Sequence, residues 1–316
     1  MHGDVNPGPD SRAAGEPRAG TRRSDEGARL RATCWGTRGS IPSPGPATAL
    51  FGGNTPCLEV RSDDGRRYVF DAGTGIRVLG NRLSQENGAT ELDLFLTHFH
   101  WDHIQGIPFF APLNEANTVV RIHAARQGDL DIETLLRGQM GPVYFPVPYE
   151  ALAATLSFEH LSGVPWRDGD IEIAAFRVRH PADTYGYRIR AGAAAVAYIP
   201  DNELVGARYP VDGPDWYPGL VDFLAGVETL FHDAMFTEDE YPRVEGWGHS
   251  TFDQAVRLAE DAGVRRLFFF HHAPERSDAE LLRILEGARA EVDRRGSALE
   301  LGIAAEGQEL LVEGRP

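Results

Sequence analysis

The sequence of 316 residues contains no lysine, and all 31 of its basic residues are arginine. The absence of lysine excludes a Walker A phosphate loop, a Schiff-base lysine and a Ser–Lys nucleophile pair. The formal net charge is −16, from 31 basic and 47 acidic residues. A protein with this charge repels polyanions on average, so a long nucleic-acid substrate is disfavoured.

Cysteine and long apolar runs are also scarce. Cys34 and Cys57 are the only cysteines, and they are interpreted as small, partly buried residues of a protein in a reducing compartment. No stretch contains the roughly 20 apolar residues that a membrane span requires, and the N-terminus shows no apolar signal core. We therefore expect a cytoplasmic protein that does not associate with membranes.

Hydrophobic patterning divides the chain into two parts. Residues 1–28 are mostly Gly, Pro, Arg, Asp, Glu, Ser and Ala without periodicity, which predicts a disordered tail. Residues 29–316 contain no repeat and no long linker, which predicts one domain. Alternation and β-branched or aromatic content predict strands at 31–36, 56–62, 66–71, 91–97, 118–124, 170–179, 185–191, 194–200, 228–234, 265–271, 299–304 and 308–312. Helices are predicted at 75–84, 103–111, 129–137, 148–154, 251–262 and 278–295. This order of elements indicates two packed sheets with helices outside.

The densest group of potential metal ligands is THFHWDH, directly after the apolar run LDLFL. In an extended segment His98, His100 and Asp102 point to the same side, and His103 follows one residue later. Four ligands are too many for one ion that must also hold a water molecule. The motif therefore predicts two metal ions.

This H-x-H-x-D-H motif after a strand resembles the signature of the metallo-β-lactamase superfamily, whose fold is a four-layer αββα sandwich. Further matches follow in order: His180 in RVRHPADTYGYRI, Asp201 in AYIPDNE, and one of His271 and His272 in FFFHHAPERSD. Strand alternation lets only one of these last two histidines face the metals. His272 is preferred because it aligns with the superfamily's strand-Thr-His-x-Ser pattern. The resemblance covers residues 31–285.

The resemblance also implies a distribution of the ligands over two divalent ions. The expected set is His98, His100 and His180 on one ion, Asp102, His103 and His272 on the other, and Asp201 as the bridge. Zn²⁺ is favoured because the set is rich in imidazole, with Mn²⁺ and Fe left open because carboxylates also contribute. Asp71, in the FDAGTGIR segment, is expected to brace the ligand loop or to form a turn before Gly73.

Two later segments resemble the phosphodiesterase branch of the superfamily, which includes tRNA 3′-processing endonucleases and small cyclic phosphodiesterases. They are His232-Asp233-Ala234 and His249-Ser250-Thr251. By resemblance His249 supplies a proton or positive charge to the leaving alkoxide, and Asp233 orients it where the family has Glu. Asp102 is expected to be catalytic as well as a ligand.

The sequence therefore predicts a binuclear metal-dependent hydrolase that acts through a metal-bridging hydroxide. The expected substrate is a small or cyclic phosphodiester, because residues 104–170 contain only four arginines and no basic arm that would grip tRNA. The alternative is a carboxylic substrate, namely a lactone, thioester or β-lactam, on the same metals. The aromatic segments 138–149 and 209–216 are interpreted either as a lid or as a homodimer contact.

Overall fold

The structure is a computed structural model that describes residues 27–86 and 88–314. The expected N-terminal tail lies outside the described residues except for its last two positions. The described residues form these strands: β1 (Arg29–Gly36), β2 (Cys57–Ser62), β3 (Arg67–Phe70), β4 (Glu91–Phe95), β5 (Val119–Ala124), β6 (Thr155–His160), β7 (Trp166–Asp168), β8 (Ile171–Arg177), β9 (Tyr185–Ala191), β10 (Ala194–Ile199), β11 (Thr229–Asp233), β12 (Arg266–Phe270), β13 (Glu300–Ile303) and β14 (Glu309–Glu313). The α-helices are α1 (Gly75–Leu83), α2 (Trp101–Ile104), α3 (Ile132–Gln139), α4 (Trp216–Leu224), α5 (Phe252–Asp261) and α6 (Asp278–Arg294).

The strands form two seven-stranded mixed sheets. The first sheet has the order β14-β1-β2-β3-β4-β5-β6, and the second has the order β13-β12-β11-β10-β9-β8-β7. Strands β3 to β6 are parallel in the first sheet, and β10 to β13 are parallel in the second. The remaining neighbours are antiparallel.

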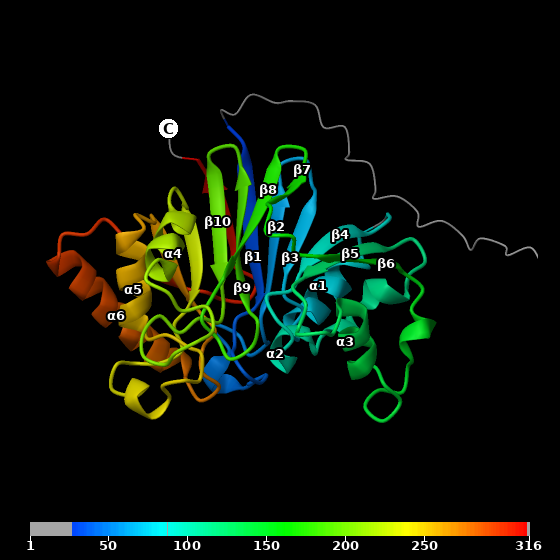
Figure 1. The fold of residues 1–316 in the computed structure, drawn as a ribbon, viewed down its shortest axis with the longest axis horizontal. Helices are drawn as coiled ribbons and strands as arrows, with labels where there is room; N and C mark the ends of the chain where they lie inside the picture. Colours follow the sequence, from blue (N-terminus) through cyan, green and yellow to red (C-terminus); the bar gives the residue numbers. More distant parts are fainter. Residues whose placement is uncertain (1–26, 87, 315–316) are drawn as a thin grey trace, which may run out of the picture.

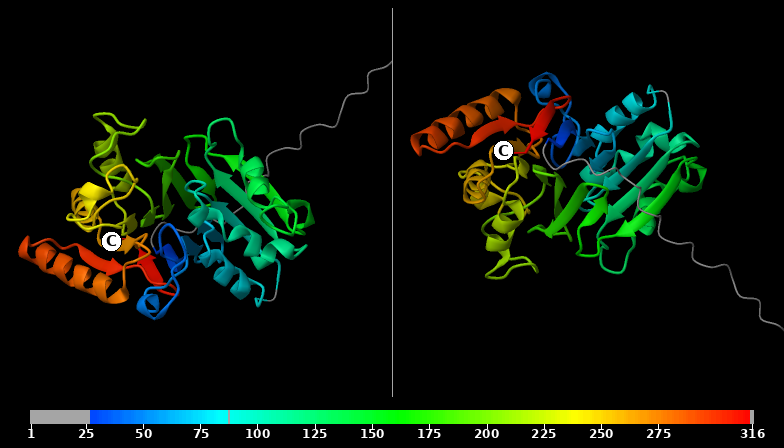
Figure 2. Two further views of the ribbon diagram at one scale, coloured as in Figure 1. Left: turned by 90° about the horizontal axis from the view of Figure 1, so that it is seen from below. Right: turned by 90° about the horizontal axis from the view of Figure 1, so that it is seen from above.

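Three hydrophobic cores hold these layers together. The inner core lies between the sheets and contains residues of both, among them Phe70, Phe95, Tyr187 and Tyr198. A second core joins the first sheet to α1 and α3, and a third joins the second sheet to α4, α5 and α6. Figure 1 shows the two helical layers on opposite sides of the sheets, and the views in Figure 2 show the same arrangement along the strands. The predicted four-layer αββα sandwich is confirmed.

Most predicted elements are present, with differences where local patterns are weak. Strands β6 and β7 were not predicted, because β6 lies largely exposed and β7 has three residues. The expected helix 103–111 is the single turn α2 followed by short 3₁₀ turns, and 148–154 contains only a 3₁₀ turn at Tyr149–Ala151. Helix α5 begins one residue later than its Ser250 signal suggested, because Thr251 and Gln254 form the capping box.

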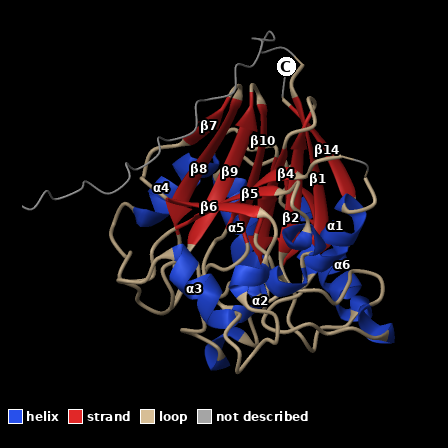
Figure 3. Cartoon of the chain, turned by 90° about the vertical axis from the view of Figure 1, so that its right-hand side faces the viewer, coloured by secondary structure: helices blue, strands red, loops and turns tan. Residues whose placement is uncertain are grey.

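The ends of several strands meet at one edge of the sandwich. Because parallel strands share a direction, the carboxyl ends of β10, β11 and β12 lie side by side. The loop after β4 meets them across the two sheets, since His98 and His103 lie against Asp201. Helix α2 follows β4 at this edge, among the loops at the lower end of the molecule in Figure 3. Among the described helices, none has the length and apolar character needed to cross a membrane.

Candidate metal centre

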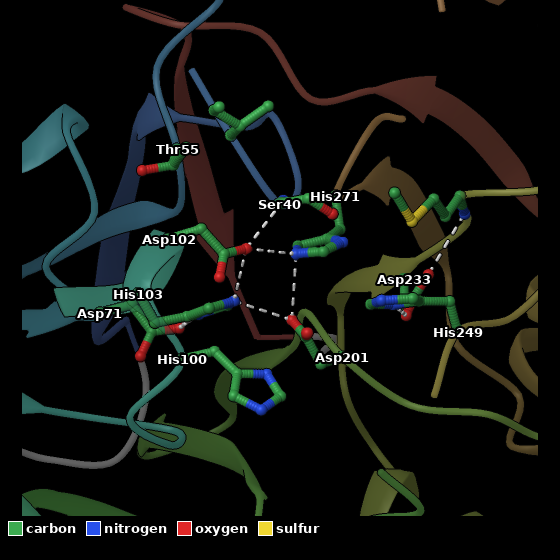
Figure 4. Close-up of polar contacts among 12 residues, drawn as sticks. Ser40, Thr55, Asp71, His100, Asp102, His103, Asp201, Asp233, His249 and His271 are labelled. Atoms are coloured by element: carbon green, nitrogen blue, oxygen red, sulfur yellow. Dashed lines mark hydrogen bonds and ion pairs between the residues drawn. The ribbon is translucent and has the colours of Figure 1, made fainter. Parts of the chain in front are cut away.

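Histidine and aspartate side chains converge at this edge of the sandwich (Figure 4). The groups whose potential ligand atoms lie within 4.8 Å of one another are His98, His100, His180 and Asp201; Asp102, His103 and His271; and Asp201, His249 and His271. All of these residues are buried except His100. The loop after β4, the β8–β9 connection, the ends of β10 and β12 and, for His249, the segment before α5 supply them, so residues far apart in sequence form one centre.

Asp201, a member of the first group, also faces the histidines of the second group. Its Oδ2 is 3.8 Å from His98 Nε2 and 3.6 Å from His180 Nε2. Its Oδ1 is 3.0 Å from His103 Nε2 and 3.3 Å from His271 Nε2. Each carboxylate oxygen therefore faces one group, which is the placement of a ligand shared by two ions.

The spacing of the facing atoms fits divalent metal ions. Two ligands at about 2.1 Å from a tetrahedral ion are about 3.4 Å apart, and the four distances to Asp201 lie between 3.0 and 3.8 Å. His98 Nε2, His103 Nε2 and Asp201 Oδ1 are also buried without a hydrogen-bond partner. An unsatisfied buried polar atom costs about 1–3 kcal/mol, so three of them around one space are best explained by cations that they would hold.

Asp71 fixes the orientation of His103. Its Oδ2 lies 2.7 Å from His103 Nδ1, and an ionised carboxylate can only accept, so Nδ1 carries the proton and Nε2 keeps its lone pair for a metal. The same carboxylate accepts hydrogen bonds from the Thr97 backbone N–H at 2.8 Å and from the Tyr198 hydroxyl at 3.0 Å. Asp71 therefore ties the ligand loop to the inner core, rather than serving only as a turn former.

The electrostatics of the centre favour added positive charge. Burial alone would lower the pKa of His103, but the carboxylates of Asp201, Asp102 and Asp71 raise it well above its usual value. Burial alone would raise the pKa of Asp201, but His271 and His103 hold it well below its usual value. A field that stabilises a second proton on an imidazole also stabilises a divalent cation at the same place.

The structure brings His271, and not His272, into the cluster, which corrects the expected last ligand position. Strand β12 ends at Phe270, and His271 adopts a left-handed conformation with φ 59°. Alternation therefore does not extend past the strand end, and His272 turns away to donate from Nε2 to the Ala304 carbonyl at 3.0 Å. Only glycine fits opposite His271, because a Cβ at Gly39 would lie 2.4 Å from its Nδ1.

His249 lies beside the cluster and is paired with Asp233. The His249 Nδ1 is 2.8 Å from Asp233 Oδ2, and its ring stacks on His271 with centroids 4.8 Å apart. Asp233 also accepts from the backbone N–H groups of Asn202 at 3.1 Å and Met235 at 3.2 Å. Burial would lower the pKa of His249, but Asp233 raises it to about 9. Asp233, although one methylene shorter than the glutamate expected from the resemblance, thus reaches the His249 imidazole.

Glu203, which no sequence pattern indicated, holds the loop that carries His249. Its buried carboxylate accepts from the backbone N–H groups of Gly246 and Gly248, each at 2.9 Å, and from the hydroxyls of Tyr209 and Tyr241. One side chain therefore fixes the position of the segment that leads into the candidate site.

The same loop orients His180. The Gly248 carbonyl accepts from His180 Nδ1 at 3.0 Å, which leaves Nε2 to face Asp201. Gly248 has φ 89°, and a Cβ there would lie 2.2 Å from His180 Nδ1. A glycine is required at this position both for its backbone conformation and for the close approach of the imidazole.

An open hollow of about 500 Å³ gives access to the cluster. Its lining residues are Ser40, Phe99, His100, Trp101, Asp102, Asp201, His249 and His271. The lining contains no arginine, so within it positive charge would come only from bound metal ions and from protonated histidine. The hollow therefore exposes the candidate ligands and His249 to one bound molecule.

A sandwich of two mixed sheets between helices, with this His/Asp cluster at one edge, defines the class of metallo-β-lactamase-type hydrolases. The model of the beta-lactamase superfamily domain matches residues 66–272, and the chain belongs to this family. The predicted metal-dependent hydrolase class is thereby confirmed.

Similar proteins include a ribonuclease and two solved structures of the same fold. Ribonuclease Z of Haloferax volcanii is 28% identical over 325 residues, which cover 90% of this chain and 95% of the relative. The structure of the metallo-β-lactamase fold protein YhfI from Bacillus subtilis matches with a TM-score of 0.63 and 19% identity, over 90% of this chain and 99% of that protein. Human tRNase Z, short form, matches with a TM-score of 0.59 and 17% identity, over 89% and 98%.

The family model confirms the resemblance to the superfamily, and the Haloferax volcanii relative confirms the resemblance to its ribonuclease Z-like branch. The two solved structures support the fold. The Haloferax volcanii relative is named a ribonuclease, and this name gives no support to the expected restriction to small substrates.

Proposed function

We propose that the protein is a phosphodiesterase with two divalent metal ions. The observation that carries the proposal is the Asp201 carboxylate, which divides its oxygens between two His-rich groups, with the His249–Asp233 pair beside it. One centre thus combines positions for two cations with a proton donor. Phosphodiester hydrolysis uses both, because negative charge develops on the phosphoryl oxygens and on the leaving oxygen.

Each ion would have its own protein ligands. His98, His100 and His180 would hold the first ion, Asp102, His103 and His271 the second, and Asp201 both. The imidazole-rich set favours Zn²⁺, with Mn²⁺ and Fe as the alternatives. When bound, such a pair lowers the pKa of a shared water and polarises phosphoryl oxygens.

His249 would donate the proton that the leaving oxygen needs. Its Nδ1 is held by Asp233, so Nε2 is the nitrogen free to act, and the residue lines the same hollow as Asp102 and Asp201. Asp233 stabilises the imidazolium and fixes the ring. A thioester releases a thiolate, which departs without such a proton, so this pair disfavours a thioester substrate. A lactone or β-lactam would use the same proton donor and is separated from a phosphodiester by assay.

We propose a small phosphodiester as the substrate. The net charge of −16, the absence of lysine and the lack of arginine in the lining of the hollow support this choice. RNA is the second candidate, because the 28% identical relative over 90% of the chain is named Ribonuclease Z. An RNA substrate would have to bind without a basic arm in residues 104–170.

The reaction class is tested by hydrolysis of bis-p-nitrophenyl phosphate beside a lactone and a thioester, with the metal-loaded protein. We expect the phosphodiester to be the best substrate, with activity lost on chelation and restored by Zn²⁺ or Mn²⁺. A preference for the lactone or thioester would overturn the proposal.

The substrate size is tested separately with a 3′-extended tRNA and with dinucleotides and cyclic nucleotides, at matched ionic strength. We expect turnover of the small diesters. Efficient cleavage of the tRNA with a steep salt dependence would favour the ribonuclease instead.

A further inference from the structure

Trp101 is an exposed aromatic residue within the ligand loop itself. It lies between His100 and Asp102 at the start of α2, and 80% of its surface is exposed. Among the described residues, Trp101 alone combines a large exposed apolar side chain with a place in the lining of the hollow. Trp101 therefore contributes to the lining of the same hollow as the candidate ligands His100, Asp102 and Asp201.

Folding gives no reason for an exposed tryptophan at this position. No aromatic contact and no side-chain hydrogen bond joins Trp101 to another described residue. By contrast, Trp247 packs edge-on against Phe236 with centroids 6.4 Å apart. Indole has a large apolar surface whose exposure to water is unfavourable, and such a side chain is stabilised when a flat group covers it.

We propose that Trp101 is the stacking platform for a nucleobase in the phosphodiester substrate, and that it determines specificity for nucleotides over simple alkyl diesters. This inference rests on the proposed function. The partly buried Phe99 adds a second aromatic side chain to the same lining. Because the lining contains no arginine, the part of the substrate beyond the phosphate is recognised by its flat apolar face rather than by charge.

Stacking of this kind is tolerant of base identity, because every base has a π-face. Removal of an aromatic platform weakens binding of one base by about 5- to 150-fold. For a platform as open to solvent as Trp101 we expect the lower part of this range, about tenfold. The binding of the phosphate itself should be unaffected, since the candidate metal ligands do not change.

The test compares two substrates with the same leaving group, thymidine 5′-(p-nitrophenyl phosphate) and methyl p-nitrophenyl phosphate, on the metal-loaded protein. We expect Trp101→Ala to raise the KM of the thymidine ester about tenfold and that of the methyl ester by less than about twofold. Trp101→Phe should restore most of the affinity for the thymidine ester. Leu282→Ala, at an exposed apolar residue of α6 outside the hollow, serves as the control and should change neither KM.

Equal losses on both esters, no loss on either, or the same nucleotide-specific loss in Leu282→Ala would each overturn the assignment. Metal content and oligomeric state are measured for each variant. A change of oligomeric state in Trp101→Ala with equal losses would show that this side chain forms a contact between chains. Failure of the unsubstituted protein to hydrolyse either ester would instead refute the proposed phosphodiesterase activity.

Discussion

Replacement of His249 by alanine separates proton donation from metal binding. In the structure this imidazole touches Asp233 and the ring of His271, and we assign it to no metal ion. Asp233 keeps two backbone donors, from Asn202 and Met235, after the substitution. The variant should therefore fold and retain both ions. A positioned general acid contributes about 10²–10⁴-fold, and 10³-fold corresponds to about 4 kcal/mol of transition-state stabilisation.

The assay is the kcat of a metal-loaded His249→Ala variant on two phosphodiesters, one with an alkoxide and one with a p-nitrophenolate leaving group. The alkoxide needs a proton as it departs, so its kcat should fall by about 10²–10⁴-fold. The p-nitrophenolate is stable without a proton, so kcat for that substrate should fall much less. Metal analysis of the same sample is the control. Equal losses on both substrates, or loss of an ion with the imidazole, would refute the role of proton donor.

Two further predictions concern the surroundings of His249. Asp233 raises the pKa of this imidazole to about 9, so activity that needs the protonated imidazole is lost as pH rises through that value. Asp233→Asn should therefore shift the alkaline limb of the pH profile of kcat to lower pH. If this limb stays at the same pH, the result counts against the pairing of His249 with Asp233. Glu203→Gln removes the negative charge that accepts four hydrogen bonds near Gly248. Denaturant unfolding should therefore show that the free energy of unfolding falls by about 2–4 kcal/mol. The control Glu300→Gln, at an exposed ion pair, should lower it by less than about 1 kcal/mol.

The layers of the fold follow from the sequence because most strands are long and alternate or are continuously apolar. Strands such as Ala194–Ile199 and Arg266–Phe270 are buried along nearly their whole length, and the apolar composition of such segments predicts a buried strand. The short edge strand Trp166–Asp168 and helix α4 lack a comparable signal, so only tertiary contacts reveal them.

The sequence predicts most of the candidate metal ligands, but not the residues that hold those ligands in position. The motif THFHWDH places four side chains by local geometry alone. The choice of His272 rested on its alignment with the superfamily's strand-Thr-His-x-Ser pattern, and such an alignment does not reveal the left-handed turn at His271 that ends the strand. Glu203 and Tyr198 act on the centre through Gly248 and Asp71, which lie far from them in the sequence. Only the folded structure shows these contacts.

The central claim, that two ions share Asp201, is tested most directly by elemental analysis of the purified protein and of two adjacent variants. We predict about two divalent ions per folded chain in the unsubstituted protein and in His272→Ala, and about one in His271→Ala, because of these two neighbouring histidines only His271 faces Asp102 and Asp201. One ion or none in fully active protein, or loss of an ion from His272→Ala with both retained in His271→Ala, would contradict this account.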